Sequence, residues 1–173
     1  MRVFHATDDS ISSLMRDGDY AVAPHNHSFD IALFPLSGRA YNVLMFTRPY
    51  AGIDFQYQIS KPDESSFGLG QSRPIELHSM NPSRITGNGV ELREVDVHSV
   101  IAESGASWLA VQISEDKAPP LYCYSRRPDF IVAADGMYAP MTAGELAEQS
   151  YIFDAAMETV ERLASEGVIT WQA

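Results

Sequence analysis

The chain has 173 residues and a formal net charge of −11, from 23 acidic and 12 basic side chains. A field of this sign repels a phosphate backbone, so we expect no direct contact with nucleic acid. Apolar residues make up 45% of the chain, which excludes disorder throughout, and no apolar run is long enough for a membrane span or a signal peptide, so we expect a cytoplasmic protein without membrane contact.

The strand predictions rest on runs that are rich in aromatic and β-branched residues. In chain order, a short strand at residues 2–6 precedes a short N-terminal helix at residues 8–18. Residues 61–70 have the composition of a loop. A slip in the alternation after Leu92 indicates a bulge or an early strand end. The remaining predicted strands are 41–47, 53–60, 74–80, 90–97, 107–114, 121–125, 129–134 and 168–171.

The clearest predicted element is a long amphipathic helix between Thr142 and Gly167, in which apolar residues recur at helical spacing, with a break near residue 149 left open. With the strands and the short N-terminal helix, it predicts an α+β fold, mainly antiparallel, in a single domain that spans residues 1–173. Its acidic side chains form either a solvated face or a surface for a basic protein partner. The candidate partner-binding residues are Glu145, Glu148, Asp154, Glu158 and Glu161.

Two histidines with one residue between them, His25 and His27, mark residues 23–38 as a candidate metal site. Iron, manganese, nickel and zinc bind neutral imidazole, often with a carboxylate beside it, and Asp30 could supply that oxygen. In a strand, histidines two positions apart point to the same face. The alternative, which we favour at this point, is a solvated polar loop after Pro24 without any metal ligand.

The same stretch resembles the first motif of cupins, which are small β-barrels that bind a metal within the barrel. Gly18 precedes the histidine pair, and the turn at residues 36–38 stands where a cupin's first motif closes. A second motif is matched in order by Gly68, Pro74, His78 and Asn81. The resemblance implies a divalent transition metal held by His25, His27 and His78. Ile31 stands where the family has a glutamate ligand, and the alternative for His78 and His98 is a hydrogen-bonded structural role.

Residues 3–18 are similar to the opening of ADP-ribosyltransferase-type domains, in which a strand bearing His-x-Thr leads into a helix. In that family the histidine holds the ribose of NAD. The resemblance therefore implies His5 as the candidate catalytic residue, with Thr7 beside it. No Gln-x-Glu or Glu-x-Glu pair is present to supply the family's glutamate. The alternative is that His5 is an ordinary strand residue.

Residues 150–171 are similar to the end of some small bacterial immunity proteins. The single cysteine, Cys123, excludes an internal disulfide, and we expect a buried structural thiol. Both catalytic sets are incomplete, whereas the acidic charge and the size fit a binding module directly. The favoured hypothesis is therefore a non-catalytic inhibitor or immunity-type protein without a cofactor, and a metal-binding protein and an NAD-using enzyme are the alternatives.

Overall fold

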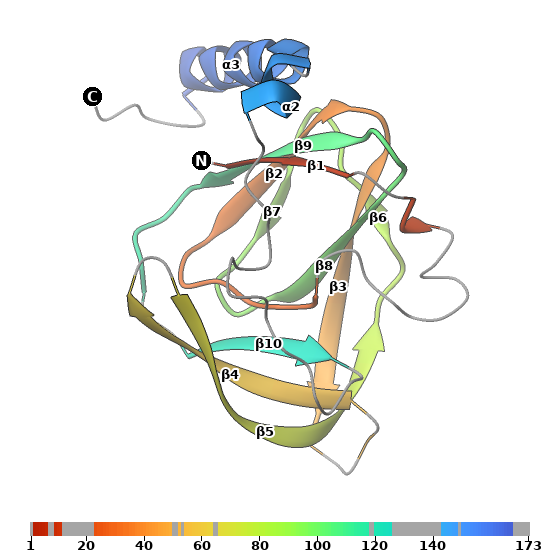
Figure 1. The fold of residues 1–173 in the computed structure, drawn as a ribbon, viewed down its shortest axis with the longest axis vertical. Helices are drawn as coiled ribbons and strands as arrows, with labels where there is room; N and C mark the ends of the chain where they lie inside the picture. The colour runs from red at the N-terminus through yellow and green to blue at the C-terminus, as the bar shows by residue number, and fades with distance from the viewer. Residues whose placement is uncertain are drawn as a thin grey trace.

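The structure of the protein is a computed structural model that describes most of the central part of the chain and the C-terminal helical segment. Ten strands and two helices lie in the described part (Figure 1). The side chains at 60–63, 66–71, 145, 146, 148 and 153 are outside the description. The described residues are 2–6, 9–11, 23–49, 52, 54–63, 66–117, 120–125, 143–148 and 150–167.

The strands form two antiparallel sheets. The first has the order β1-β9-β2-β7, with β1 at Arg2–His5, β2 at Ile31–Ser37, β7 at Val90–Leu92 and β9 at Ser107–Gln112. The second has the order β10-β4-β5-β3-β6, and β8 also pairs with β3. Its strands are β3 (Ala40–Arg48), β4 (Asp54–Asp63), β5 (Ser66–Ser79), β6 (Ser83–Arg84), β8 (Val97–Ala102) and β10 (Leu121–Ser125).

The main core lies between the two sheets. Ile31 and Leu33 of β2 pack with Trp108 of β9 from the first sheet, and with Val100 and Ala102 of β8 from the second. These positions are two residues apart along each strand, so their side chains share one face. Both sheets therefore turn one apolar face toward the same core.

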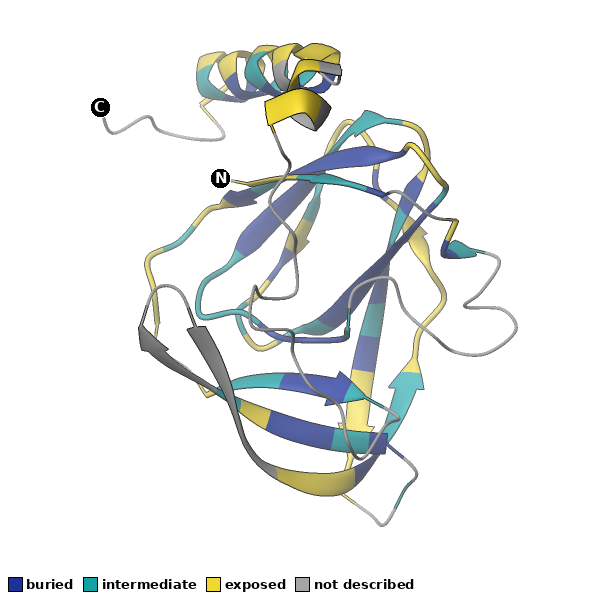
Figure 2. Ribbon diagram, viewed as in Figure 1, coloured by how far each residue is buried: buried dark blue, intermediate teal, exposed yellow. Residues whose placement is uncertain are grey.

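Helices α2 (Ala143–Glu148) and α3 (Ser150–Ser165) follow the strands, and α3 covers the outer face of the first sheet. Val160 and Leu163 of α3 pack on Phe34 and Leu109. Figure 2 shows this pattern as a buried stripe on the side of α3 that faces the sheet and an exposed outer side. The first four residues of β2 are buried because both faces of the strand are covered. Gly167 follows the helix at a φ of 72°, which is typical of a glycine that ends a helix.

The predicted α+β class is wrong: the described chain is mostly antiparallel β-sheet, and α3, with 16 residues, is its one substantial helix. The predicted long C-terminal helix is divided into α2 and α3. Of the predicted N-terminal helix, only residues 9–11 are described, and there the Ser10 hydroxyl accepts a hydrogen bond from the backbone N–H of Ala102 at the end of β8 (2.8 Å). This segment is tied to the second sheet, and its Ile11 packs against Val43 and Met45 of β3 and Ile101 of β8.

The predicted loop at residues 61–70 is also wrong, because β4 and β5 continue through most of it. Ser60 pairs with Gly68, and Asp63 pairs with Ser66, with irregular register between the two pairs. Backbone pairing sustains these strands where the side chains favour a loop. The predicted strands at 129–134 and 168–171 lie outside the described residues. In the part of the chain that is described, no helix has the length and apolar character to cross a membrane.

Candidate metal centre

The stretch around His25 joins the two ends of the second sheet. The backbone of His25 exchanges hydrogen bonds with that of His98 in β8, at 3.0 and 2.9 Å. On the other side, His25 bridges to Cys123 of β10, and the N–H of Tyr124 donates to the carbonyl of Pro24 at 2.9 Å. Because β10, β4, β5, β3 and β8 pair in that order, this single rung completes a ring of strands.

The interpretation of this stretch as a solvated polar loop is wrong. His25 and Asn26 are only 5% and 8% exposed. The amide side chain of Asn26 donates to the carbonyl of Pro120 (3.0 Å) and accepts from the N–H of Tyr122 (2.7 Å), so it bonds to the backbone beside β10 as a strand neighbour would. The Asn26 side chain can be buried because its amide bonds to backbone groups, so its hydrogen-bonding capacity is satisfied away from water.

Three histidine rings meet at this rung: His25, His27 and His98. One possible ligand atom from each lies within 4.8 Å of the other two. The ring centroids are 4.7 to 5.1 Å apart, and the Nε2 atoms of His27 and His98 are 2.9 Å apart. Nitrogen ligands of a tetrahedral metal lie about 3.3 Å apart, given metal–nitrogen bonds of about 2.0–2.1 Å. The cluster is therefore close to the spacing of a metal-binding set.

Hydrogen bonds orient two of the three rings. The Nδ1 atom of His25 donates to the carbonyl of Ala23, and that of His98 donates to Oδ1 of Asn42, both at 2.8 Å. Both acceptors are oxygens without a proton, so the shared proton belongs to the histidine. In a neutral ring this leaves the lone pair on Nε2, and Nε2 of His98 faces Nε2 of His27 within the cluster. Metal-binding histidines are usually held in this way by a carbonyl or carboxylate.

The electrostatic environment keeps all three rings neutral. Burial lowers the pKa of His25, and a hydrogen bond to Ala23 opposes this only in part. Burial, followed by repulsion from His25 and Arg2, lowers the pKa of His27 to about 3. Burial and the other two histidines also hold the pKa of His98 well below its usual value. Neutral imidazole is the form that binds a metal, so protons do not compete for this site near pH 7.

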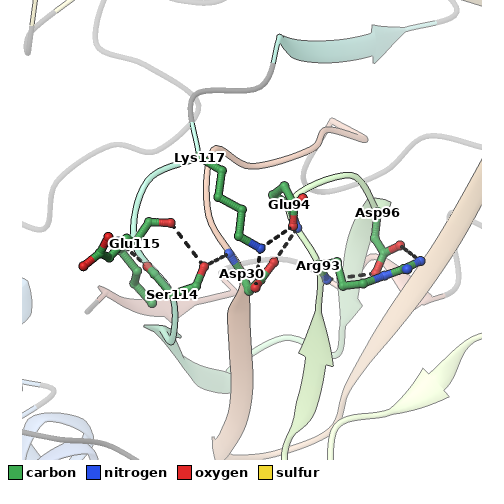
Figure 3. Close-up of polar contacts among 8 residues, drawn as sticks. Asp30, Arg93, Glu94, Asp96, Ser114, Glu115 and Lys117 are labelled. Carbon is green, nitrogen blue, oxygen red and sulfur yellow. Dashed lines mark hydrogen bonds and ion pairs between the residues drawn. The ribbon is translucent and has the colours of Figure 1, made fainter.

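Lys117, Asp30 and Glu94 form an ion-paired clamp (Figure 3), and the backbone of His27 bonds to its Glu94. Lys117 donates to carboxylate oxygens of Asp30 (2.8 Å) and Glu94 (2.9 Å), and the N–H of Glu94 donates to the other oxygen of Asp30. The N–H of His27 then donates to the carbonyl of Glu94 at 3.2 Å. The Lys117 ammonium holds the pKa of the Asp30 carboxyl well below its usual range. Asp30, considered above as a possible metal ligand, therefore serves this clamp and is not part of the histidine cluster.

His78 is not part of the cluster either, although the cupin resemblance implied it as the third ligand. It lies on β5, where its ring stacks on Phe46 with centroids 5.0 Å apart, and its Nε2 is 3.2 Å from a carboxylate oxygen of Glu76. His98 occupies the third place instead. The spacing of histidines along the sequence does not indicate His98 as a ligand. Backbone pairing between distant segments brings His98 to His25.

The other predicted site residues lie elsewhere. His5 ends β1, and its Nδ1 is 2.8 Å from the hydroxyl of Ser107, while Thr7 is outside the described residues. Cys123 is buried, as predicted. Asp154, Glu158 and Glu161 are exposed on α3, and the side chains of Glu145 and Glu148 are outside the description. The roles of His5 in NAD binding and of these acids in binding a basic partner stay predictions.

Three neutral nitrogen donors form a set that suits zinc, iron, cobalt, nickel or copper better than magnesium or calcium, which prefer oxygen. The described residues add no acid or cysteine to this set. Comparison with known proteins found no family model, no curated protein and no solved structure that matches the chain.

Proposed function

We propose that the protein binds a divalent transition metal through the Nε2 atoms of His25, His27 and His98. The observation that carries this proposal is the convergence of three neutral rings, two of which have their protons fixed on the far nitrogen. His98 takes the place that the cupin resemblance gave to His78. The metal-binding alternative is thus supported with a changed third ligand.

A purely structural, hydrogen-bonded role is the alternative to metal binding. Buried polar groups normally find hydrogen-bond partners, because an unpaired one costs free energy. Within the cluster, the only hydrogen bond between rings joins His27 to His98. The proton of this bond lies on Nε2 of His27, because Nδ1 of His98 already carries the proton that it donates to Asn42. A metal ion bound by the cluster would displace that proton and give the three rings one common partner.

The five histidines of the chain allow a matched test of this proposal. Purified protein is stripped with chelator and titrated with Zn²⁺ or Co²⁺, and bound metal is counted by mass spectrometry. We expect one ion per chain in the wild type, and loss of stoichiometric binding in His25→Ala, His27→Ala and His98→Ala, because each substitution removes one of three donors. Circular dichroism checks that each variant remains folded.

His5→Ala and His78→Ala are the control variants, since neither residue belongs to the cluster. Both should retain one ion per chain. Stoichiometric binding that survives in folded His98→Ala, or that disappears in His78→Ala, contradicts the proposed ligand set. A metal-free wild type in excess Zn²⁺ contradicts metal binding itself.

A further inference from the structure

The three rings are packed so closely that an ion can reach them only if part of the cluster moves. His25 is 5% exposed and His98 is 3% exposed, whereas His27 is half-buried. The Nε2 atom of His27 also lies 2.9 Å from that of His98 and donates its proton to the lone pair there. The closed cluster therefore blocks one of its own ligand atoms, and a ring must turn away before an ion binds all three.

Two of the rings are fixed in place. His98 lies in β8, which pairs with β3 along its whole length, and its Nδ1 donates to Asn42. His25 pairs through its backbone with both β8 and β10, and its Nδ1 donates to the carbonyl of Ala23. Among the described residues, the ring of His27 has a hydrogen bond only to His98. Rotation of the His27 side chain is therefore the smallest movement that opens the cluster.

Phe29 lies beside the ring that has this freedom. The ring centroids of His27 and Phe29 are 6.0 Å apart, with an angle of 33° between the planes. Phe29 is half-buried and packs against the main core, so its own ring is held from behind. The contact between the two rings thus favours the closed position of His27.

We propose that the His27 ring is the gate of the metal site and that Phe29 is the positioning residue that holds this gate closed. The ring turns outward to admit or release an ion, and it returns as the last of the three ligands. This inference rests on the proposed function and adds the route by which the ion enters and leaves.

Phe29→Ala tests the gate because it removes the contact and keeps all three proposed ligands. The loss of one aromatic contact should raise the population of the open position about threefold to tenfold. Stopped-flow absorption measures the uptake of Co²⁺, and excess EDTA, at concentrations where the rate no longer depends on EDTA, measures its release. We expect both rates to rise by the same factor. The Kd for Co²⁺ should stay within about twofold of wild type, since the free and the loaded closed states lose the same contact.

Phe4→Ala is the matched control. Phe4 is also half-buried and packs against the same core, but its ring stacks on Trp108, with centroids 5.6 Å apart. This variant should take up and release Co²⁺ at the wild-type rates. Phe29→Leu keeps much of the apolar volume and removes the aromatic contact, so it should raise both rates even if Phe29→Ala does not fold.

Three results would overturn the gate. The first is a folded Phe29 variant with wild-type rates, and the second is a weaker Kd with an unchanged rate of uptake, which indicates a structural role. The third is an equal acceleration in Phe4→Ala, which indicates a general loosening of the core. Each of these results leaves the metal site standing, whereas failure of the wild type to bind Co²⁺ at all overturns the proposed function.

Discussion

Below pH 6.5 the metal-free protein should lose unfolding free energy as the pH falls, by at most about 4 kcal/mol per pH unit, because three histidines take up protons when the chain unfolds. In the folded chain, burial lowers the pKa of His25, His27 and His98, that of His27 to about 3. In the unfolded chain all three return to about 6.5. Stability is therefore complete above pH 6.5 and is lost as the pH falls toward the folded pKa values, by about 1.4 kcal/mol per proton and pH unit.

Urea unfolding of chelator-treated protein at pH 7, 6 and 5 measures this slope. His27→Gln removes one of the three protons taken up on unfolding and should reduce the slope by about a third. His27 is the suitable position because its ring is less deeply buried than the other two. His78→Gln, outside the cluster, should leave the slope unchanged. A wild-type slope no steeper than that of His27→Gln would show that the fold does not hold the His27 ring neutral.

Leu163→Ala should lower the unfolding free energy by about 3 kcal/mol, because it leaves a cavity between α3 and the first sheet. Leu163 is 2% exposed and packs in one cluster with Phe34, Leu109 and Val160. Glu161→Ala, on the exposed side of the same helix, should change stability by no more than about 0.5 kcal/mol. Urea unfolding at pH 7 compares the two variants.

Equal effects of the two substitutions would mean that α3 does not pack on the sheet as described. The metal stoichiometry of Leu163→Ala should remain one per chain, because its cluster shares no residue with the three histidines. The unfolding free energy of Leu163→Ala thus reports on the packing of α3, and its metal stoichiometry reports on the candidate site.

Much of the sheet could be predicted from local patterns. The run at residues 121–125 corresponds to β10, and the slip after Leu92 marks the end of β7. Strand β2 lies in the stretch where the polar residues after Pro24 suggested a loop. In the structure Pro35 pairs with Trp108 at a register shift, which is the kind of irregular position where a strand tolerates proline. Helix α3 covers one face of β2 and the second sheet covers the other. The residues of β2 themselves do not indicate either contact.

The candidate site was predictable only in part. Side chains two positions apart in an extended chain share one face, so the sequence predicts that His25 and His27 act as a pair. His98 lies 71 residues from His27 in the chain, and it joins the cluster through the backbone pairing of β8 with the rung at His25. Asn42, which orients His98, comes from a third strand. Such partners depend on the register of the sheet, which local patterns do not reveal. The resemblance to cupin motifs therefore named His78 as the third ligand, whereas the structure has His98.

Diffraction from crystals of zinc-loaded protein, collected at the zinc absorption edge, tests the central claim most directly. We expect one anomalous peak per chain, about 2.0–2.1 Å from Nε2 of His25, His27 and His98. A single peak between His78 and Glu76, or a zinc-loaded chain without a peak among the three rings, would contradict it.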